Sequence, residues 1–355
     1  MSDRLELAAQ EVTAVVPGPC EIVRVDVDEA GGLVLTARAK AGTRWFTHDD
    51  RGLIERFPER DPKLPLGAHL RETTGWEVLS YRPARRLVAS VRRTERVNVM
   101  KGHKRGRSAR AAVHQSVAET AMRAGAFRVP RLLAHDGRHE ALVFEFLPAR
   151  EVELGRASAD AYGELGRRLR VFQEHAAARD LAVFAVRDEL GVLQRWEQKV
   201  LQATGGLPEG WSAGRARLAQ QAEGLEAPRL GLCHRDLHDR QVHADAQGLA
   251  LLDFDLLCCA DVALDAGNLL AHLAWRAVQG LHGADASSVR ALERSFLDGL
   301  GRQGEAGFAT RLAFYRASAC LRLALVYRLR PTWAPLVHEL VARAEAALDD
   351  LAPIG

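Results

Sequence analysis

The sequence lacks the features that would send a chain into or across a membrane. No uncharged apolar run approaches the roughly 18 residues that a membrane-spanning helix needs. The first residues include Asp3, Arg4 and Glu6, where a secretory signal would be apolar, so we expect no export by that route. The five cysteines are scattered and form no C-x-x-C pair, which is typical of buried thiols in a reducing cytoplasm.

An excess of charge of one sign is missing too. The 49 Lys and Arg residues oppose 46 Asp and Glu residues, for a net charge of +3. This balance argues against a generally basic nucleic-acid coat and against an acidic solvating protein, so any electrostatic recognition should be local. With 355 residues, 47% of them hydrophobic, the chain is long enough for two domains or one large two-lobed unit.

The first part of the chain has the alternating pattern of strands. Apolar and polar residues alternate over 23–39 around Gly31-Gly32, which predicts an antiparallel hairpin. The whole first quarter is interpreted as strand, up to a charged, proline-punctuated segment at 59–66 that is the best candidate for a boundary. Short strands are expected at 45–46, 53–54, 76–81, 86–92, 96–101 and 141–147.

The later part of the chain is mostly helical. One β-like island, residues 230–257, interrupts it. A strand-rich lobe, a short strand ended by Pro148 and a helical lobe together predict an α+β protein with a cleft between its lobes. Helices are expected at 108–124, 158–172 with Ser158 as N-cap, 265–279, 288–300, 308–329 and 331–351.

The island at 230–257 carries the residues best suited to chemistry. Asp236 and Asp253 lie on the two arms of one supersecondary unit, and Gln241 follows on the first arm. Transfer of a phosphoryl group needs one carboxylate to orient the acceptor hydroxyl and another to hold Mg²⁺, and an amide oxygen can complete the metal shell. The ordered set of His234, Asp236, Gln241, Asp253 and Asp255 therefore predicts a phosphotransferase.

These residues carry a resemblance to a known family. His-Arg-Asp-Leu at 234–237, with Asp253-Phe254 downstream, matches the protein-kinase catalytic loop and metal aspartate. With His238 at the fifth position, the segment resembles more closely the aminoglycoside phosphotransferases and their relatives, the choline kinases and maltokinases. The segment 265–268 resembles the family's D-x-x-N, and the similarity covers about residues 76–280. No A-P-E segment is found, which argues against a protein kinase.

The resemblance implies a two-lobed protein-kinase-like fold with antiparallel-sheet N-lobe and helical C-lobe. It implies a strand-rich cap at 1–75, an N-lobe at 76–148 and a C-lobe at 149–355, with the catalytic loop within 234–255. The implied reaction moves the γ-phosphate of ATP, or of GTP, to a hydroxyl of a small molecule with Mg²⁺. By resemblance, the catalytic group is Asp236, His234 and Arg235, and the metal ligands are Gln241, Asp253 and Asp255.

Two positions in the loop depart from the family pattern. Arg235 stands where the family has Gly, as in protein kinases. Gln241 stands where the family has Asn, which keeps the amide oxygen but lengthens the arm by one methylene. His234 is expected to brace the loop.

The resemblance also implies nucleotide-binding residues in the N-lobe. Lys101 would bind the phosphates, with Glu119 in the following helix as its partner. Lys104 is a rival, but Lys101 keeps the strand phase of Val97 and Val99.

A glycine-rich phosphate loop is absent, and a basic turn at 81–86 occupies its place. Arg85 in that turn is a candidate phosphate donor, against the alternative that the turn is merely basic. By resemblance, Glu145 and Leu147 would contact the adenine through their backbone.

The sequence does not identify the acceptor. Aminoglycoside pockets are usually acidic, and Glu164, Glu174 and Asp265 are candidates for such a pocket. The position and strand character of the cap resemble maltokinase-like enzymes, which favours a sugar or an aminosugar. We expect no nucleic-acid or membrane partner, and the oligomeric state is not predicted.

Three other interpretations compete with the kinase. A pseudokinase that only binds is suggested by Gln241 and the missing glycine loop. The basic segment 101–110 could bind nucleic acid, but the chain's charge balance argues against it. A zinc site of Cys233, His234, His238 and His243 fits none of the usual ligand spacings.

Overall fold

The computed structural model describes residues 3–93 and 96–350. Its first part is a four-stranded antiparallel sheet of order β1-β2-β3-β4, crossed by a helix. The elements are α1 (Asp3–Val15), β1 (Cys20–Val27), β2 (Leu33–Ala39), β3 (Gly42–Asp49) and β4 (Gly52–Arg56). The predicted hairpin is confirmed, with Val27 opposite Leu33. The interpretation of the first quarter as strand throughout is wrong at its start, because Leu5, Ala8 and Val12 recur at helical spacing and are buried in α1.

The predicted boundary segment is structured and packs onto the next sheet. It contains a 3₁₀ turn, η1 (Pro58–Arg60), and a short helix, α2 (Pro65–Arg71). Leu66 and Leu70 are buried in one apolar cluster with Leu87. Gly102 lies so close to Leu66 that a Cβ at this position would approach the Leu66 Cβ to 2.7 Å. The segment therefore belongs by its packing to the sheet that follows it.

The second sheet has five antiparallel strands in the order β5-β6-β7-β9-β8. Helix α3 packs against β8 and β9. The strands predicted at 76–101 and at 141–147 and the helix predicted from 108 are confirmed. The elements are β5 (Trp76–Arg82), β6 (Arg86–Arg93), β7 (Arg96–His103), α3 (Ser108–Arg123), β8 (Leu132–Asp136) and β9 (Ala141–Glu145).

The remainder is helical, as predicted, with two small three-stranded sheets inserted. Ser158 stands at the N-cap of its helix, but its side chain makes no capping hydrogen bond. The last predicted helix begins later than expected, at His338. The helices are α4 (Ala159–Gln173), α5 (Val186–Thr204), α6 (Trp211–Glu223), α7 (Ala263–Gln279), α8 (Ala286–Leu300), α9 (Phe308–Arg328) and α10 (His338–Asp349). The strands are β10 (Arg150–Glu151), β11 (Val183–Phe184), β12 (Leu230–Cys233), β13 (Val242–Asp245), β14 (Gly248–Leu251) and β15 (Cys258–Asp261).

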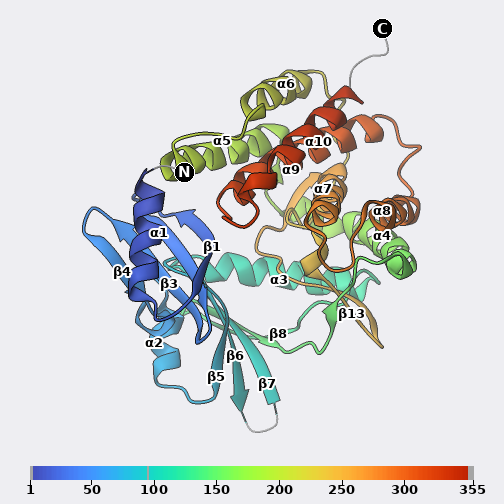
Figure 1. The fold of residues 1–355 in the computed structure, drawn as a ribbon. Coiled ribbons are helices and arrows are strands. Elements are labelled where there is room, and N and C mark those ends of the chain that lie inside the picture. The colour runs from blue at the N-terminus through green and yellow to red at the C-terminus, as the bar shows by residue number, and fades with distance from the viewer. Residues whose placement is uncertain (1–2, 94–95, 351–355) are drawn as a thin grey trace.

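The N-terminal sheet shares its core with the helical lobe. Val12 and Leu35 belong to the same buried cluster as Trp211 and Trp275. Figure 1 shows α1 and its sheet (blue) lying beside α5, next to the five-stranded sheet below. The N–H of Val25 donates to the carbonyl of Leu329 at 2.9 Å, which fastens β1 to the end of α9. Within 3–93 and 96–350, no helix combines the length and the apolar character needed to cross a bilayer.

Candidate active site

The predicted catalytic loop follows β12 and is fixed by a buried carboxylate from α7. Asp265 accepts the backbone N–H groups of His234 and Arg235, both at 2.7 Å. Arg235 has a left-handed backbone with φ of 68°, which is uncommon for a side chain of its size. Burial raises the pKa of Asp265, and hydrogen bonds to its charged form partly oppose that rise. Asp265 therefore holds the loop and is not free to line an acidic acceptor pocket.

His234 joins the two arms of the site, as the bracing role predicts. Its Nε2 donates to the carbonyl of Leu252 at 2.8 Å, and its Nδ1 accepts the N–H of Asp236 at 3.2 Å. Because the carbonyl can only accept, Nε2 is the ring nitrogen that donates in this arrangement. The side-chain amide of Asn268 adds a further hydrogen bond to the loop by donating to the carbonyl of Leu237 at 2.8 Å. The half-buried carboxylate of Asp236 has no hydrogen-bond partner among the described residues, so it is free to accept one.

Two carboxylates and two cations meet where the second arm faces the N-lobe. Lys101 on β7 lies 2.7 Å from Asp253 and 2.7 Å from Asp255. Arg86 on β6 lies 2.8 Å from Asp253 and 3.6 Å from Asp255. Burial alone would raise the pKa of Asp253, but Lys101 and Arg86 outweigh it and hold that pKa well below its ordinary value. Both positive charges thus keep the Asp253 carboxylate ionised.

A cavity of about 390 Å³, which we call the interlobe cavity, extends from this ion cluster to the strand between the lobes. Gln241 lines it beside Asp253, while Glu145 and Leu147 line it at the predicted hinge. Its side walls are mostly apolar and come from both lobes, which is the composition of a small-molecule site. The wall residues include Leu79, Val88, Val99, Leu142, Phe144 and Leu252.

The choice of Lys101 over Lys104 agrees with the structure, but its predicted partner is wrong. Lys104 bonds to the exposed Glu29, outside the cavity. Glu119 accepts the N–H of Leu132 at 2.6 Å instead of pairing with Lys101. Glu119 does not reach Lys101 because it lies one helical turn beyond Ala111 and Gln115, the α3 residues that line the interlobe cavity.

The phosphate-binding assignment of Arg85 is also contradicted by its contacts. Its guanidinium donates to the carbonyl of Val27 at 2.9 Å, so it points toward the N-terminal sheet. Arg86 is the residue that sequence reasoning missed. Its signal was the strand phase, because Arg86 shares a face with Val88, and Val88 is the strand partner of Lys101.

Three more candidate residues are engaged by other side chains. The guanidinium of Arg235 lies 4.0 Å from the centre of the Phe184 ring and lines a neighbouring cavity, so its contacts give no support for a catalytic role. Glu164 pairs with Arg167 and Arg168 on its own helix. Glu174 is likewise engaged by arginines, among them Arg170 and Arg302.

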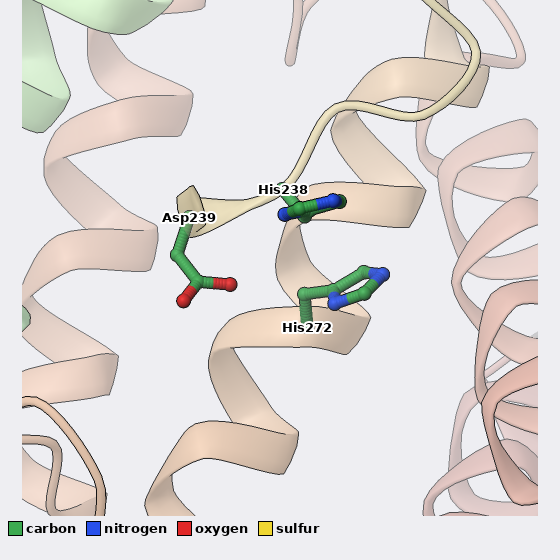
Figure 2. A group of neighbouring side chains, drawn as sticks. All are labelled: His238, Asp239 and His272. Atoms are coloured by element: carbon green, nitrogen blue, oxygen red, sulfur yellow. The ribbon is translucent and has the colours of Figure 1, made fainter. Parts of the chain in front are cut away.

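The four residues considered and disfavoured as a zinc site do not come together as ligands. Cys233 and His243 bond to separate backbone carbonyls, and His234 braces the loop. A different trio does gather, His238, Asp239 and His272, whose ligand atoms lie within 4.8 Å of one another (Figure 2).

The trio does not have the geometry of a metal site. The His238 and His272 rings stack at 28° with centroids 4.8 Å apart, so their in-plane lone pairs do not converge on one point. Arg276 already holds the Asp239 carboxylate at 2.8 Å.

Comparison with known proteins identifies the family. Residues 84–314, more than half of the chain, match the model of the phosphotransferase enzyme family. The chain belongs to this family. The predicted resemblance is thereby confirmed, and membership supports phosphotransferase activity on a small molecule. No curated protein sequence matches the chain.

Solved structures of kinases in this family share the fold. A choline/ethanolamine kinase family protein from Mesorhizobium loti aligns with a TM-score of 0.56 at 18% identity, covering 83% of this chain and 95% of the other. Amicoumacin kinase, solved with AMP-PNP and Ca²⁺, aligns with 0.58 at 15% identity, covering 84% and 96%. Choline kinase from Streptococcus pneumoniae aligns with 0.54 at 13% identity, covering 81% and 97%. The predicted two-lobed, protein-kinase-like fold is confirmed.

Proposed function

We propose that the protein transfers the γ-phosphate of ATP, with Mg²⁺, to a hydroxyl of a small molecule of the sugar, aminosugar or aminoglycoside type. The observation that carries this proposal is the ion cluster of Lys101, Arg86, Asp253 and Asp255 at one end of an apolar cavity whose other end is the hinge. The adenine would lie between the apolar walls, and the triphosphate would point to the cations. The family kinase solved with AMP-PNP supports a nucleotide as donor.

The donor set suits a magnesium ion. The carboxylates of Asp253 and Asp255 line the cavity, and Gln241 adds an amide oxygen. Mg²⁺ prefers such hard oxygen ligands and, when bound, neutralises charge on the phosphates. Lys101 and Arg86 would transfer from the carboxylates to phosphate oxygens, so each charged group keeps an opposite charge beside it.

Asp236 would act on the acceptor. Its carboxylate is half-buried and unpartnered within the described part of the chain, and it lies on the loop that Asp265 and His234 hold rigid. It would accept a hydrogen bond from the acceptor hydroxyl and take its proton as the phosphoryl group is transferred.

The test combines nucleotide binding with turnover. ATP should raise the melting temperature, and withholding Mg²⁺ should remove most of that rise. ADP release should then depend on one class within a panel of sugars, amino alcohols and aminoglycosides. Absence of any nucleotide-dependent shift would overturn the proposal. A shift with no ADP release on any panel member would favour the pseudokinase alternative, which Gln241 motivates.

A further inference from the structure

A second cavity, of about 920 Å³, lies beside the interlobe cavity, and we call it the cap cavity. Its walls come from β1 to β3, from β5, and from the ends of α7 and α9 with the chain that follows them. Leu79 on β5 lines both cavities. Arg240, on the same loop as Asp236, also lines the cap cavity. A molecule bound there would lie beside the side wall of the interlobe cavity formed by Leu79, and near the loop that carries Asp236 and Arg240.

The cap cavity is strongly positive. Among the described residues lining it there are five arginines and one carboxylate, that of Glu21. Glu21 accepts the hydroxyl of Thr332 at 2.6 Å and forms no ion pair within the described chain. The arginines are Arg24, Arg38, Arg240, Arg276 and Arg330.

Two of the five, Arg38 and Arg330, form no ion pair within the described chain, whereas Arg24, Arg240 and Arg276 pair with Asp26, Glu151 and Asp239. Arg24 pairs with Asp26 at 3.0 Å, but Asp26 also lies 3.8 Å from Arg85. Arg330 donates to the carbonyls of Val25 and Leu329, and forms no ion pair with any described residue. Arg82, between this group and Arg86, is likewise without an acidic partner in the described chain, and its buried Nε has no hydrogen-bond acceptor.

Burial and the neighbouring positive charges lower the pKa of two guanidiniums, those of Arg24 and Arg82. Burial, followed by the charge of Arg330, lowers the pKa of Arg24 to about 10. Burial, followed by the charges of Arg24 and Arg86, lowers the pKa of Arg82 to about 9. Guanidiniums remain protonated at neutral pH, so this repulsion persists in the folded protein. A bound anion would relieve it.

The other walls suit a hydroxylated ring. Trp45, Tyr327 and Trp333 offer aromatic faces, and the hydroxyls of Thr36 and Thr43 line the same space. For an ammonium group the cavity offers fewer partners: Glu21 is the one carboxylate among the described residues that line it, and Glu164, Glu174 and Asp265 are held elsewhere.

We propose that the cap cavity binds the phosphoryl acceptor, and that this acceptor is a hydroxylated compound carrying an oxyanion group, a carboxylate or a phosphate ester, held by Arg330 and Arg24. This inference rests on the proposed function and narrows its acceptor from sugars and aminosugars to anionic ones. Arg38 contributes long-range attraction from the rim, where its side chain is exposed.

The first experiment uses inorganic phosphate as probe. The protein is saturated with AMP-PNP and Mg²⁺ so that the interlobe cavity is filled, and phosphate is titrated at constant ionic strength while the melting temperature is followed. Phosphate should stabilise the native protein. In Arg330→Gln its apparent Kd should rise at least tenfold, and in Arg290→Gln, an exposed position on α8, it should not change. Absence of stabilisation, or equal stabilisation of all three proteins, would overturn the inference.

A second variant guards against misfolding of Arg330→Gln, whose guanidinium also fastens Val25. Arg38→Gln removes an exposed cation with no ion pair to any described residue, so it should fold normally. We expect a threefold or larger weakening of phosphate binding, and an unchanged Kd would count against the site.

The last arm is a matched set of acceptors: glucuronate, glucose 6-phosphate, glucose and glucosamine. The anionic members should exceed glucose and glucosamine in kcat/KM at least tenfold, and the better of the two anions identifies the oxyanion. A preference for glucosamine or glucose would overturn the inference while leaving the kinase proposal intact. Absence of nucleotide binding would overturn the kinase proposal, and the phosphate titration would still decide whether the anion site exists.

Discussion

The role proposed for the Asp236 carboxylate separates the phosphotransferase proposal from the alternative of a protein that only binds. Substitution Asp236→Asn should lower kcat by about 10²- to 10⁴-fold, the usual range for general-base catalysis, with little change in the Kd for ATP. The reason is that Asn has nearly the same size but cannot take the hydroxyl proton. The check is kcat on the best acceptor together with nucleotide titration by calorimetry. Equal turnover of the two proteins would refute the role.

Lys101 and Lys104 form a matched pair of lysines only three residues apart. Lys101→Met should raise the Kd for ATP more than tenfold, because it removes the buried cation at the phosphate end of the interlobe cavity. Lys104→Met, the control, should leave the Kd unchanged, since Lys104 pairs only with exposed Glu29 among the described residues. Fluorescence titration with a labelled nucleotide measures both. If the two variants lose affinity equally, the assignment of Lys101 is wrong.

The position of a residue in the site could be predicted where it follows from a short sequence pattern. The alternation of Val97, Val99 and Lys101 fixes which side of β7 faces the cavity, and Lys101 lies there as expected. The partners of Lys101, Asp253 and Asp255, were not predictable from spacing, because they lie about 150 residues away in the sequence and only tertiary packing brings them to β7. Arg85 and Arg86 are neighbours in the sequence, but Arg85 contacts Val27 of the N-terminal sheet and Arg86 contacts Asp253. A shift of one residue along an extended chain moves a side chain to the other face.

The hairpin of β5 and β6 takes the place of a glycine-rich loop, and it is stiffened from outside. Asp61 accepts the hydroxyl of Tyr81 at 2.8 Å and the N–H of Ala84 at 2.6 Å. Ala84 has a φ of 56°, so the turn needs this support. Arg86, which pairs with Asp253, follows directly. The turn is thus held in place just before Arg86, which lines the interlobe cavity.

Removing the Asp61 carboxylate should affect the turn between β5 and β6 more than it affects the fold as a whole. Asp61→Ala leaves a buried hydroxyl and an N–H without their acceptor, which should cost about 1–3 kcal/mol of unfolding free energy. We expect the KM for ATP to rise several-fold with a smaller fall in kcat. Asp49→Ala, which removes a similar turn carboxylate in the first sheet, is the control. Nucleotide KM values that remain equal in Asp61→Ala and the native protein would show that the turn does not position Arg86.

At the level of elements, long patterns were predictable and short or buried ones were not. The period-two hairpin at 23–39 formed as expected. Helix α2 was missed because a seven-residue helix beginning at Pro65 offers only two turns of pattern, and its formation depends on Leu66 and Leu70 packing against the sheet. The proline that suggested a boundary instead starts this helix, where its missing N–H costs nothing.

At the scale of the whole molecule, the N-terminal sheet and the helical lobe share one apolar core, which a division of the chain into three successive segments does not convey. Val12 and Leu35, near the N-terminus, share a core with Trp211 and Trp275 of the helical lobe. Such long-range burial leaves no mark in local periodicity. The same arrangement closes the cap cavity, because Arg24 from β1 and Arg330 after α9 meet only when the first sheet docks. The proposed acceptor site is therefore a product of tertiary packing.

A buried histidine should make the stability of the whole molecule depend on pH. His272 is only 7% exposed, and both its ring nitrogens lack a hydrogen-bond partner among the described residues. Burial, followed by the charges of His238 and Arg322, holds its pKa well below the ordinary value. Below a pH of about 6.5, His272 binds a proton in the unfolded chain but stays unprotonated in the folded protein. Stability from this group should therefore fall by up to about 1.4 kcal/mol for each pH unit below 6.5, and should be constant above it.

The substitution His272→Phe tests this linkage and keeps a ring stacked on His238. It removes two buried polar atoms without partners, so stability at pH 7.5 should be equal or higher, provided the larger ring is accommodated. Between pH 6.5 and 5.5 the free energy of unfolding should fall less steeply in the variant, by a slope that corresponds to about one proton. Urea unfolding at four pH values from 5.5 to 7.5 measures the slope, with His338→Gln at the exposed surface as control. A slope that His272→Phe leaves unchanged would mean that the ring titrates alike in the folded and unfolded chain, and that the stack is open to water.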